Sequence, residues 1–377
     1  MGKDNTIEAF FALVRAGLWE TEVQLTSYGE VDYADILRLA QEQAVVGLVA
    51  AGFEHVIDVK VPQQWALQFA GQTIQLEQRN KAMNQFIADL VSEMRNADIY
   101  TLLVKGQGIA ECYERPQWRI SGDIDFFLSD SNYEKAKEFL VPRASSVEPE
   151  GIYGKHLGMV IDGWSVELHG NLRCGLSNRV DKELEAVLID TFNNGNVRSW
   201  NDDGVQVFML GVKNDAFYVF NHFLGHFYKG GIGLRQICDW CRLLWIYRDS
   251  LNYGLLEQRI KSAGLMSEWK AFGALAIEYL GFPKDSMPLL DVRSKKEDVR
   301  WRKKADRIME FILKSGNMGH NRDMTHFSKY PYLIRKFVSM GRRIGDLINH
   351  ARIFPLDSLR FFPRIMFNGV RSAMRGE

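Results

Sequence analysis

The sequence predicts an α+β protein in which a small mixed β-sheet core is flanked by N-terminal and C-terminal helical regions. Apolar residues recur at helical spacing before residue 97 and again after residue 210. Between these regions, short apolar runs end at glycine-containing turns, as β-strands do. We therefore divide the chain into an N-terminal helical region (1–96), an α/β core (97–210), a helical region packing on the core (211–280), a linker (281–298) and basic C-terminal helices (299–377).

The N-terminal region contains three helical patterns. Apolar residues lie three and four apart in 7–19 and in 33–51, and Asp32 or Asp35 can cap the second helix. A longer stretch without helix breakers runs from 62 to 96, and Pro62 suits a helix start. We expect one helix in each stretch.

The core begins with a β-type run over 99–104, and a short helix is expected over 109–114. The next apolar strand is expected over 123–128. Asp162-Gly163 is a typical hairpin turn and separates two apolar runs. The remaining expected elements of the core are a helix over 131–140, the hairpin strands over 156–161 and 164–169, and a strand over 205–209.

After residue 210 the chain returns to helical patterns. The charged stretch 281–296 contains two prolines and is the best linker candidate. The expected helices cover 213–228, 234–247, 255–263, 267–280 and 299–314, followed by a helical tail.

The sequence holds 47 basic and 47 acidic side chains, so total charge favours no class of partner. The stretch from Lys329 to Arg375 is nonetheless basic and rich in phenylalanine. It can contact nucleic acid, a phosphorylated substrate or, as a peripheral membrane contact, anionic lipid; it can also be a solvated face of helices. No nucleic-acid-binding module accompanies the core, which argues against a nucleic-acid partner.

The number of cysteines and the hydropathy of the chain indicate its cellular compartment. Cys238 and Cys241 have the spacing of a zinc or redox motif, but they lie in an expected helix without a second ligand pair. This favours buried, small apolar residues. Few, scattered cysteines, no signal-peptide pattern and no apolar run of membrane-spanning length predict a cytoplasmic protein.

Two carboxylates lie at the start of the strand expected over 123–128. Side chains at positions i and i+2 of a strand face the same way, so Asp123 and Asp125 project together. Adjacent carboxylates repel each other unless a cation lies between them. Mg²⁺ prefers such oxygen ligands, and phosphoryl or nucleotidyl transfer uses pairs of such ions.

Glu167 is the candidate third carboxylate. It lies in the second hairpin strand and shares one face with His169. The alternative is a solvent-facing glutamate in a sheet with one exposed side. His169 can orient a metal ligand, contact phosphate or be a structural histidine.

A glycine-rich turn, Lys105-Gly106-Gln107-Gly108, follows the first expected strand. Glycines let backbone N–H groups approach an anion, and a helix N-terminus adds a positive dipole. The spacing is neither that of a Walker P-loop nor that of a dinucleotide fingerprint. Alone, the turn would be a plain connection; before a strand with two aspartates it is a candidate phosphate cradle.

These elements, in this order, resemble the polymerase-β-like nucleotidyltransferase superfamily, and within it a group of uncharacterised bacterial nucleotidyltransferases. That group carries Lys-Gly after the first strand, an aromatic residue and a proline, Arg before Gly-Asp-x-Asp, and a later acidic-Leu-His element. The matching residues are Lys105-Gly106, Tyr113, Pro116, Arg119, Gly122-Asp123-Ile124-Asp125 and Glu167-Leu168-His169. The resemblance covers roughly residues 100–245.

The resemblance implies a nucleotidyltransferase core and an enzyme that moves a nucleoside monophosphate from a nucleoside triphosphate to a hydroxyl of a small molecule, sugar or protein. Asp123, Asp125 and Glu167 would be catalytic and would bind Mg²⁺ or Mn²⁺. The triphosphate would contact Lys105, Gly106, Gln107, Arg119 and Gly122. The chain departs from the superfamily at Gln107, where serine is frequent, and at Glu167, where aspartate is commoner.

The following helices hold candidate substrate-side residues. The group typically carries a histidine and then Arg and Asp in an apolar helix, which His222, Arg235 and Asp239 resemble. His222 and His226 have the spacing of a zinc pair, but without a metalloprotease glutamate we favour site-facing or core histidines. Arg235 and Asp239 can also pair on their helix. The alternative function is a catalytically inactive nucleotide-binding or scaffolding protein of the same fold.

Overall fold

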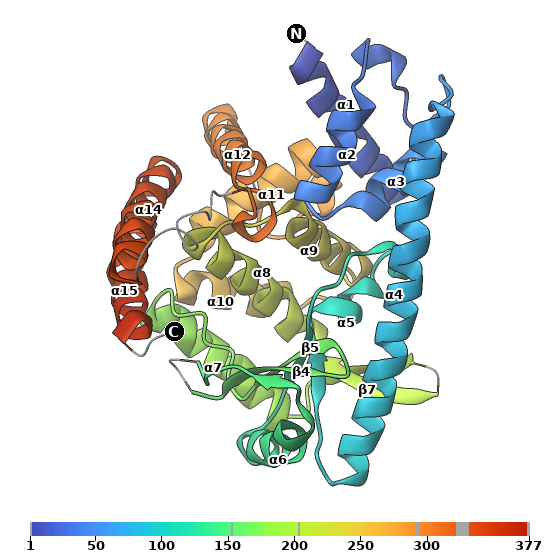
Figure 1. Cartoon of the computed structure of the whole chain (residues 1–377). Helices are drawn as coiled ribbons and strands as arrows, with labels where there is room; N and C mark the ends of the chain where they lie inside the picture. The colour runs from blue at the N-terminus through green and yellow to red at the C-terminus, as the bar shows by residue number, and fades with distance from the viewer. Residues whose placement is uncertain (1, 152–153, 203, 292–293, 322–331, 375–377) are drawn as a thin grey trace.

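A computed structural model of the chain describes residues 2–151, 154–202, 204–291, 294–321 and 332–374 (Figure 1). The helices are α1 (Gly2–Trp19), α2 (Tyr33–Glu42), α3 (Val46–Glu54), α4 (Gln63–Asn96), α5 (Gly106–Ala110), α6 (Asp130–Leu140), α7 (Asn178–Phe192), α8 (Val212–Lys229), α9 (Leu234–Ile246), α10 (Tyr253–Ala263), α11 (Met266–Leu280), α12 (Lys295–Ser315), α14 (Tyr332–Ile353) and α15 (Pro355–Met374). The strands are β1 (Leu102–Val104), β2 (Ile124–Phe127), β3 (Ser146–Val147), β4 (His156–Ile161), β5 (Trp164–His169), β6 (Val197–Asp202) and β7 (Val205–Leu210).

The strands form one mixed sheet in the order β3-β4-β5-β2-β1-β7-β6. β2 pairs parallel with β5, and β1 pairs parallel with β7, whereas the other neighbours are antiparallel. The prediction of a mixed sheet among helical regions is confirmed. Two short β-hairpins, β4–β5 and β6–β7, flank the central strands.

Each face of the sheet buries its own set of apolar side chains. One face packs Ile124, Phe126 and Leu168 against α4 and α6. The opposite face packs Val104 and Phe127 into the larger core, which also includes α1, α7, α8, α9 and the C-terminal helices. Side chains alternate along a strand, so the polar neighbours of these apolar residues face the other way. Asp125 in β2 and Glu167 in β5 therefore face the α8 side.

Local sequence explains several element boundaries. Asp32 caps α2 by accepting hydrogen bonds from the N–H groups of Ala34 and Asp35. Pro62 precedes α4 at its N-cap. Asp162 and Gly163 both have positive φ, 49° and 82°, as a tight two-residue hairpin turn requires. The β4–β5 hairpin therefore has the predicted strands and turn.

Other boundaries differ from the prediction. Residues 33–51 form two helices rather than one, because the chain turns at Ala44, whose φ is 56°. The short helix α5 begins at Gly106, directly after β1, rather than at residue 109. The sequence does not predict α7, β3 or β6.

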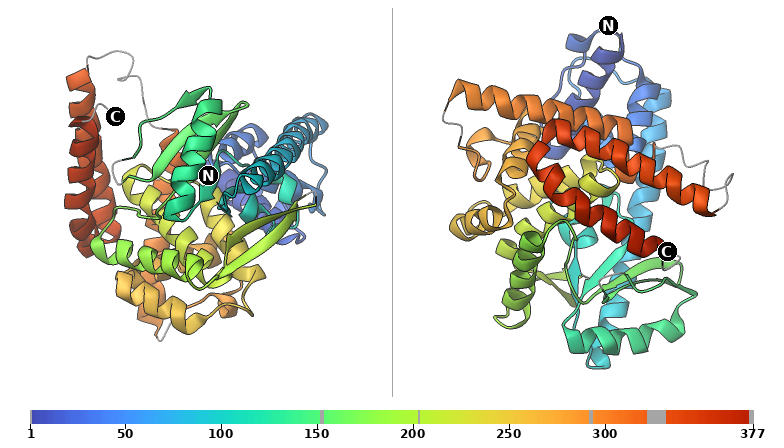
Figure 2. Two further views of the ribbon diagram at one scale, coloured as in Figure 1. Left: turned by 90° about the horizontal axis from the view of Figure 1, so that it is seen from below. Right: turned by 90° about the vertical axis from the view of Figure 1, so that its left-hand side faces the viewer.

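Helices surround the sheet on several sides. α4 runs along one side of the molecule from the N-terminal helices to the sheet, and α14 and α15 form an antiparallel pair at the opposite side (Figures 1 and 2). Within the expected linker, the side chains of Phe282 and Met287 are buried. Lys329, where the basic stretch begins, and Arg375, where it ends, lie outside the described residues.

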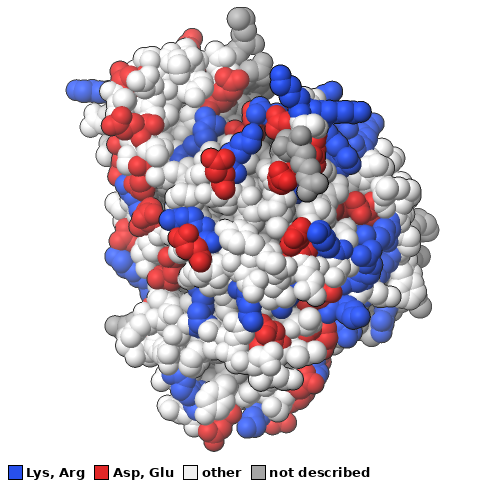
Figure 3. Space-filling model, turned by 180° about the vertical axis from the view of Figure 1, so that it is seen from behind, with Lys and Arg blue, Asp and Glu red and all other residues white. Residues whose placement is uncertain are grey.

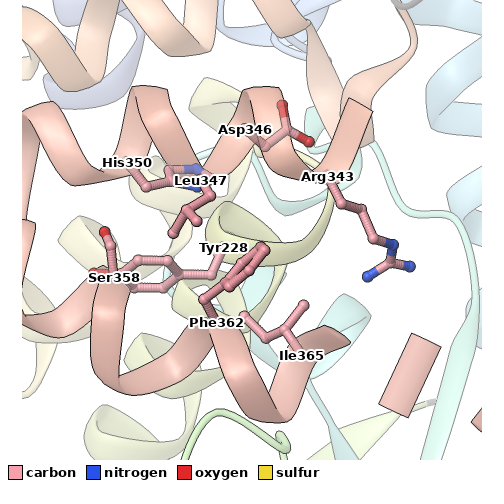
Figure 4. Close-up of a pocket in the computed structure, with 8 residues that line it drawn as sticks. All are labelled: Tyr228, Arg343, Asp346, Leu347, His350, Ser358, Phe362 and Ile365. Atoms are coloured by element: carbon pink, nitrogen blue, oxygen red, sulfur yellow. The ribbon is translucent and has the colours of Figure 1, made fainter. Parts of the chain in front are cut away.

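The α14–α15 pair packs its inner faces on α8. Tyr228 of α8 and the side chains of Leu347, Phe362 and Ile365 line a small pocket there (Figure 4). The pocket contains no residue of the central strands. None of the described helices combines the length and hydropathy that a membrane crossing requires.

Candidate functional site

The parallel pairing of β2 with β5 brings the predicted carboxylates together. Asp125 and Glu167 are directly paired in register, and Asp123 immediately precedes β2. One carboxylate oxygen from each of the three residues lies within 4.8 Å of the other two. Asp125 is only 2% exposed, whereas Asp123 and Glu167 are half-buried. The three carboxylates therefore form one cluster that is open on one side.

Two basic side chains contact the centre of this cluster. Lys105 Nζ and His169 Nε2 each lie 2.7 Å from Asp125 Oδ1. Burial lowers the pKa of Lys105, but the neighbouring carboxylates, Asp125 first, raise it more. Burial likewise opposes protonation of His169, while its hydrogen bonds to Asp125 and Glu167 raise its pKa. Asp125 is thus the carboxylate with the tightest set of partners.

The pKa values of the other two carboxylates shift in opposite directions. The charge of Asp125, followed by burial, raises the pKa of Asp123, which Lys105 only partly opposes. Burial raises the pKa of Glu167, but contacts with His156 and His169 lower it more. Glu167 Oε2 lies 3.2 Å from His156 Nε2 and 3.3 Å from His169 Nε2. Asp123 is consequently the carboxylate with the greatest uncompensated repulsion.

The glycine-rich turn after β1 lies beside the cluster. Lys105 adopts a φ of 60° and Gly106 a φ of 44°, so the turn has a conformation that L-residues rarely adopt. A Cβ atom on Gly106 would lie 3.5 Å from the carbonyl oxygen of Asp123, and a Cβ on Gly122 would meet no atom within 4 Å. Lys105, Gly106 and Gly122 therefore lie beside the carboxylates, with open space at Gly122.

The Gln107 side chain is buried and hydrogen-bonded within the fold. Its amide donates to Asn84 Oδ1 at 2.6 Å and accepts a hydrogen bond from Ser121, and the residue is 3% exposed. The side chain therefore connects α4 with the segment before β2. Of Gln107, this leaves the backbone N–H in the glycine-rich turn as the group that could contact phosphate.

Arg119 and Asp239 form a buried pair. Arg119 Nε and Nη2 each donate to one Asp239 oxygen at 2.7 Å, and the Tyr113 hydroxyl donates to the same carboxylate. Burial lowers the pKa of Arg119, but Asp239 raises it more. Arg235 does not make the alternative pair with Asp239 on the same helix; it donates to the Ile120 carbonyl at 2.7 Å. Arg119 and Arg235 thus both fix the chain segment that leads into β2.

The α8 helix presents a polar row to the same region. Tyr218, His222 and His226 are four residues apart, and adjacent rings lie 6.0 Å and 4.6 Å apart. Burial, followed by the charge of Lys105, lowers the pKa of both histidines, to about 4 for His226. Both imidazoles are therefore neutral near pH 7. The two histidines do not belong to a metal-ligating group among the described residues.

Sequence reasoning missed two residues of this region. His156 pairs directly with His169 across the β4–β5 hairpin. The two-residue turn at Asp162-Gly163 fixes this register, so the hairpin signal was sufficient to find His156. Tyr218 precedes His222 by one helical turn, a spacing that also could have identified it. Cys238 and Cys241 are free and buried in α9, as predicted for small apolar residues.

A comparison with known families gives the family of the chain. A family model described as uncharacterised nucleotidyltransferase matches residues 29–281, which is 253 of the 377 residues. The matched stretch includes the carboxylate cluster, the glycine-rich turn and α8. The chain matches no curated protein and no solved structure. The chain belongs to this family of uncharacterised nucleotidyltransferases.

Proposed function

We propose that the chain is a metal-dependent enzyme with a polymerase-β-like core that transfers a nucleoside monophosphate from a nucleoside triphosphate to a hydroxyl group of a small molecule, sugar or protein. The observation that carries the proposal is the convergence of Asp123, Asp125 and Glu167 from two parallel strands. Family membership supports nucleotidyl transfer as the reaction class.

The residues fit Mg²⁺ or Mn²⁺. All three carboxylates offer hard oxygen ligands, and the raised pKa of Asp123 reflects a repulsion that a divalent cation would relieve. Bound Mg²⁺ would neutralise charge on the triphosphate and activate the attacking hydroxyl. Asp123, Asp125 and Glu167 would hold the ion, and the half-buried Asp123 and Glu167 leave the cluster accessible to substrate.

The surrounding residues have distinct proposed roles. Lys105 orients Asp125 and places a positive charge where phosphate would approach, beside the backbone of Gly106 and Gly122. Arg119, for which the family resemblance implies a phosphate contact, is better supported as a positioning residue, because Asp239 occupies its guanidinium. Arg235 positions the same segment through the Ile120 carbonyl.

The acceptor side of the site is proposed to lie along α8. Tyr218 and the neutral histidines His222 and His226 provide hydroxyl and imidazole groups that can hydrogen-bond an acceptor. His169 Nε2 contacts Asp125 Oδ1 at 2.7 Å and so holds this carboxylate in place. A hydroxyl-bearing acceptor between α8 and the carboxylates would therefore meet both hydrogen-bonding groups and the metal ligands.

The proposal predicts transfer of label from the α-phosphate. The purified chain is incubated with α-labelled or γ-labelled nucleoside triphosphates, Mg²⁺ or Mn²⁺ and cell extract. We expect α-label to appear on an acceptor and γ-label to leave as pyrophosphate, and we expect excess EDTA to abolish transfer. Nucleotide binding without transfer, across all four bases and both ions, would instead support a catalytically inactive nucleotide-binding protein.

A further inference from the structure

We propose that His156, Glu167 and His169 form a second metal site, which takes a transition metal ion such as Zn²⁺. The three side chains are a separate ligand group, sharing only Glu167 with the carboxylate cluster. Two imidazoles and one carboxylate are a ligand set that suits Zn²⁺, whereas Mg²⁺ prefers oxygen ligands.

The β4–β5 hairpin places these ligands on one face. His156 lies directly opposite His169 on the neighbouring strand, and Glu167 precedes His169 by two residues. Directly opposite residues and residues two apart on a strand point to the same side of a sheet. The hairpin backbone, rather than a mobile loop, therefore fixes the relative positions of all three ligands.

Two of the three distances between ligand atoms match a tetrahedral ion. Glu167 Oε2 lies 3.2 Å from His156 Nε2 and 3.3 Å from His169 Nε2. Zn²⁺ bonds of about 2.0–2.1 Å in tetrahedral geometry separate neighbouring ligand atoms by roughly 3.3 Å. All three ligand atoms lie within 4.8 Å of one another, and the 46% exposed His156 side chain can rotate to close the wider edge.

The shared glutamate gives the site a regulatory consequence, which rests on the proposed function. An ion held by the two histidines would draw Glu167 away from Asp123 and Asp125. It would also occupy His169 Nε2, which otherwise donates to Asp125. Transition-metal binding and nucleotidyl transfer would therefore exclude each other.

A binding measurement tests the site without any assay of transfer. Zn²⁺ affinity of the full chain is measured by competition with a chromogenic chelator. We expect His156→Gln to weaken binding at least tenfold, while His320→Gln, at an exposed histidine outside the group, leaves it unchanged. Equal affinities of the wild-type chain and His156→Gln would overturn the proposal. A chain that binds Zn²⁺ as expected but never transfers label would refute the proposed function alone.

An independent observation carries a second proposal: we infer that the α14–α15 pair binds the surface of an anionic lipid bilayer. Its outward face is unusually apolar. Leu356 is 80% exposed, Leu359 and Phe367 are each 67% exposed, and on α14 Ile348 is 52% exposed. Exposed apolar side chains gathered on one surface generally mark an interaction site.

The pattern along α15 is continuous. Its exposed residues within the described side chains are Pro355, Leu356, Leu359, Pro363, Phe367, Val370 and Arg371. Six of these seven are apolar, and they recur three or four residues apart, so they form one stripe along the helix. The opposite face of α15 is already buried through Phe361 and Ile365. The stripe is therefore additional to the face that packs on the protein.

Charge identifies the partner as an anionic surface. Residues 332–374 contain eight Lys and Arg and two Asp; of these, Arg360 and Arg364 pair with carboxylates of the protein itself. None of the exposed residues in the described part of α14 and α15 is acidic, while Arg352 and Arg371 are exposed. Seen from behind, Lys and Arg side chains gather toward the side of the molecule on which these helices lie (Figure 3). Two copies of this face would repel each other, whereas anionic headgroups attract its cations and the acyl boundary accepts its apolar stripe.

Vesicle sedimentation of the full chain tests this inference. We expect binding to phosphatidylcholine vesicles that contain phosphatidylglycerol, weaker binding at high salt, and little binding to phosphatidylcholine alone. Leu359→Glu combined with Phe367→Glu is expected to lower binding at least tenfold. The control, Leu67→Glu, changes a 64% exposed leucine of α4 and should have no effect. No binding to either vesicle, or a solution dimer that the double variant dissociates, would overturn the assignment.

Discussion

Asp125→Asn is expected to abolish detectable transfer of α-label, with a loss on the order of 10³-fold, the upper range for removing one electrostatic contact from a reaction centre. Asp125 is the most buried of the three carboxylates and contacts both Lys105 and His169. An amide at this position has one oxygen, carries no charge and is a poor ligand for a divalent cation. The loss is measured as initial rate of label transfer at saturating Mg²⁺.

Two further variants make this result interpretable. Asp162→Asn is the matched control, because it makes the same change in the hairpin turn, where asparagine is equally suitable, and should retain full activity. Asp123→Asn should also abolish transfer, yet leave stability unchanged or higher, because it removes a carboxylate whose pKa is raised by the charge of Asp125. Normal transfer by folded Asp125→Asn protein would refute the assignment of the carboxylate cluster.

Arg119→Met is expected to destabilise the fold by about 3–5 kcal/mol, the usual cost of removing one partner from a buried ion pair. Asp239 is 5% exposed and would lose a guanidinium that donates two hydrogen bonds of 2.7 Å. The free energy of unfolding is measured by urea denaturation at pH 7.

The double variant Arg119→Met with Asp239→Leu should recover much of the lost stability, because it removes the unpaired buried charge together with its partner. Lys81→Met is the control for a surface pair: Lys81 contacts Glu77 but is 63% exposed, so its loss should cost less than about 1 kcal/mol. A loss equally small for Arg119→Met would show that the Arg119–Asp239 pair does not hold the segment before β2.

The parts of the site that rest on local patterns were predictable. Alternation of side chains predicts a common face for Asp123 and Asp125, and Asp162-Gly163 specifies the hairpin that carries Glu167. The convergence of the two strands was only an expectation, because parallel pairing of β2 with β5 is a tertiary contact that leaves no local signal.

Pairings between distant residues explain what the sequence did not predict. Arg119 and Asp239 are 120 positions apart, so nothing near either residue indicates that they pair. β6 alternates exposed and half-buried residues at the edge of the sheet and lacks a continuous apolar run. The break between α2 and α3 depends on positive φ at Ala44, a conformation that alanine seldom adopts and that only the surrounding packing can stabilise.

The position of β1 also has a consequence for how the chain acquires its native state. β1 pairs with β7 through Leu102 and Phe208, so one flank of the central sheet comes from a segment synthesised long after β1 itself. Such distant pairing makes folding slow, because the entropy of closing a long loop is lost before the contact forms. Until β7 leaves the ribosome, the nascent chain exposes an unpaired strand edge beside β1, which is a site where aggregation can start.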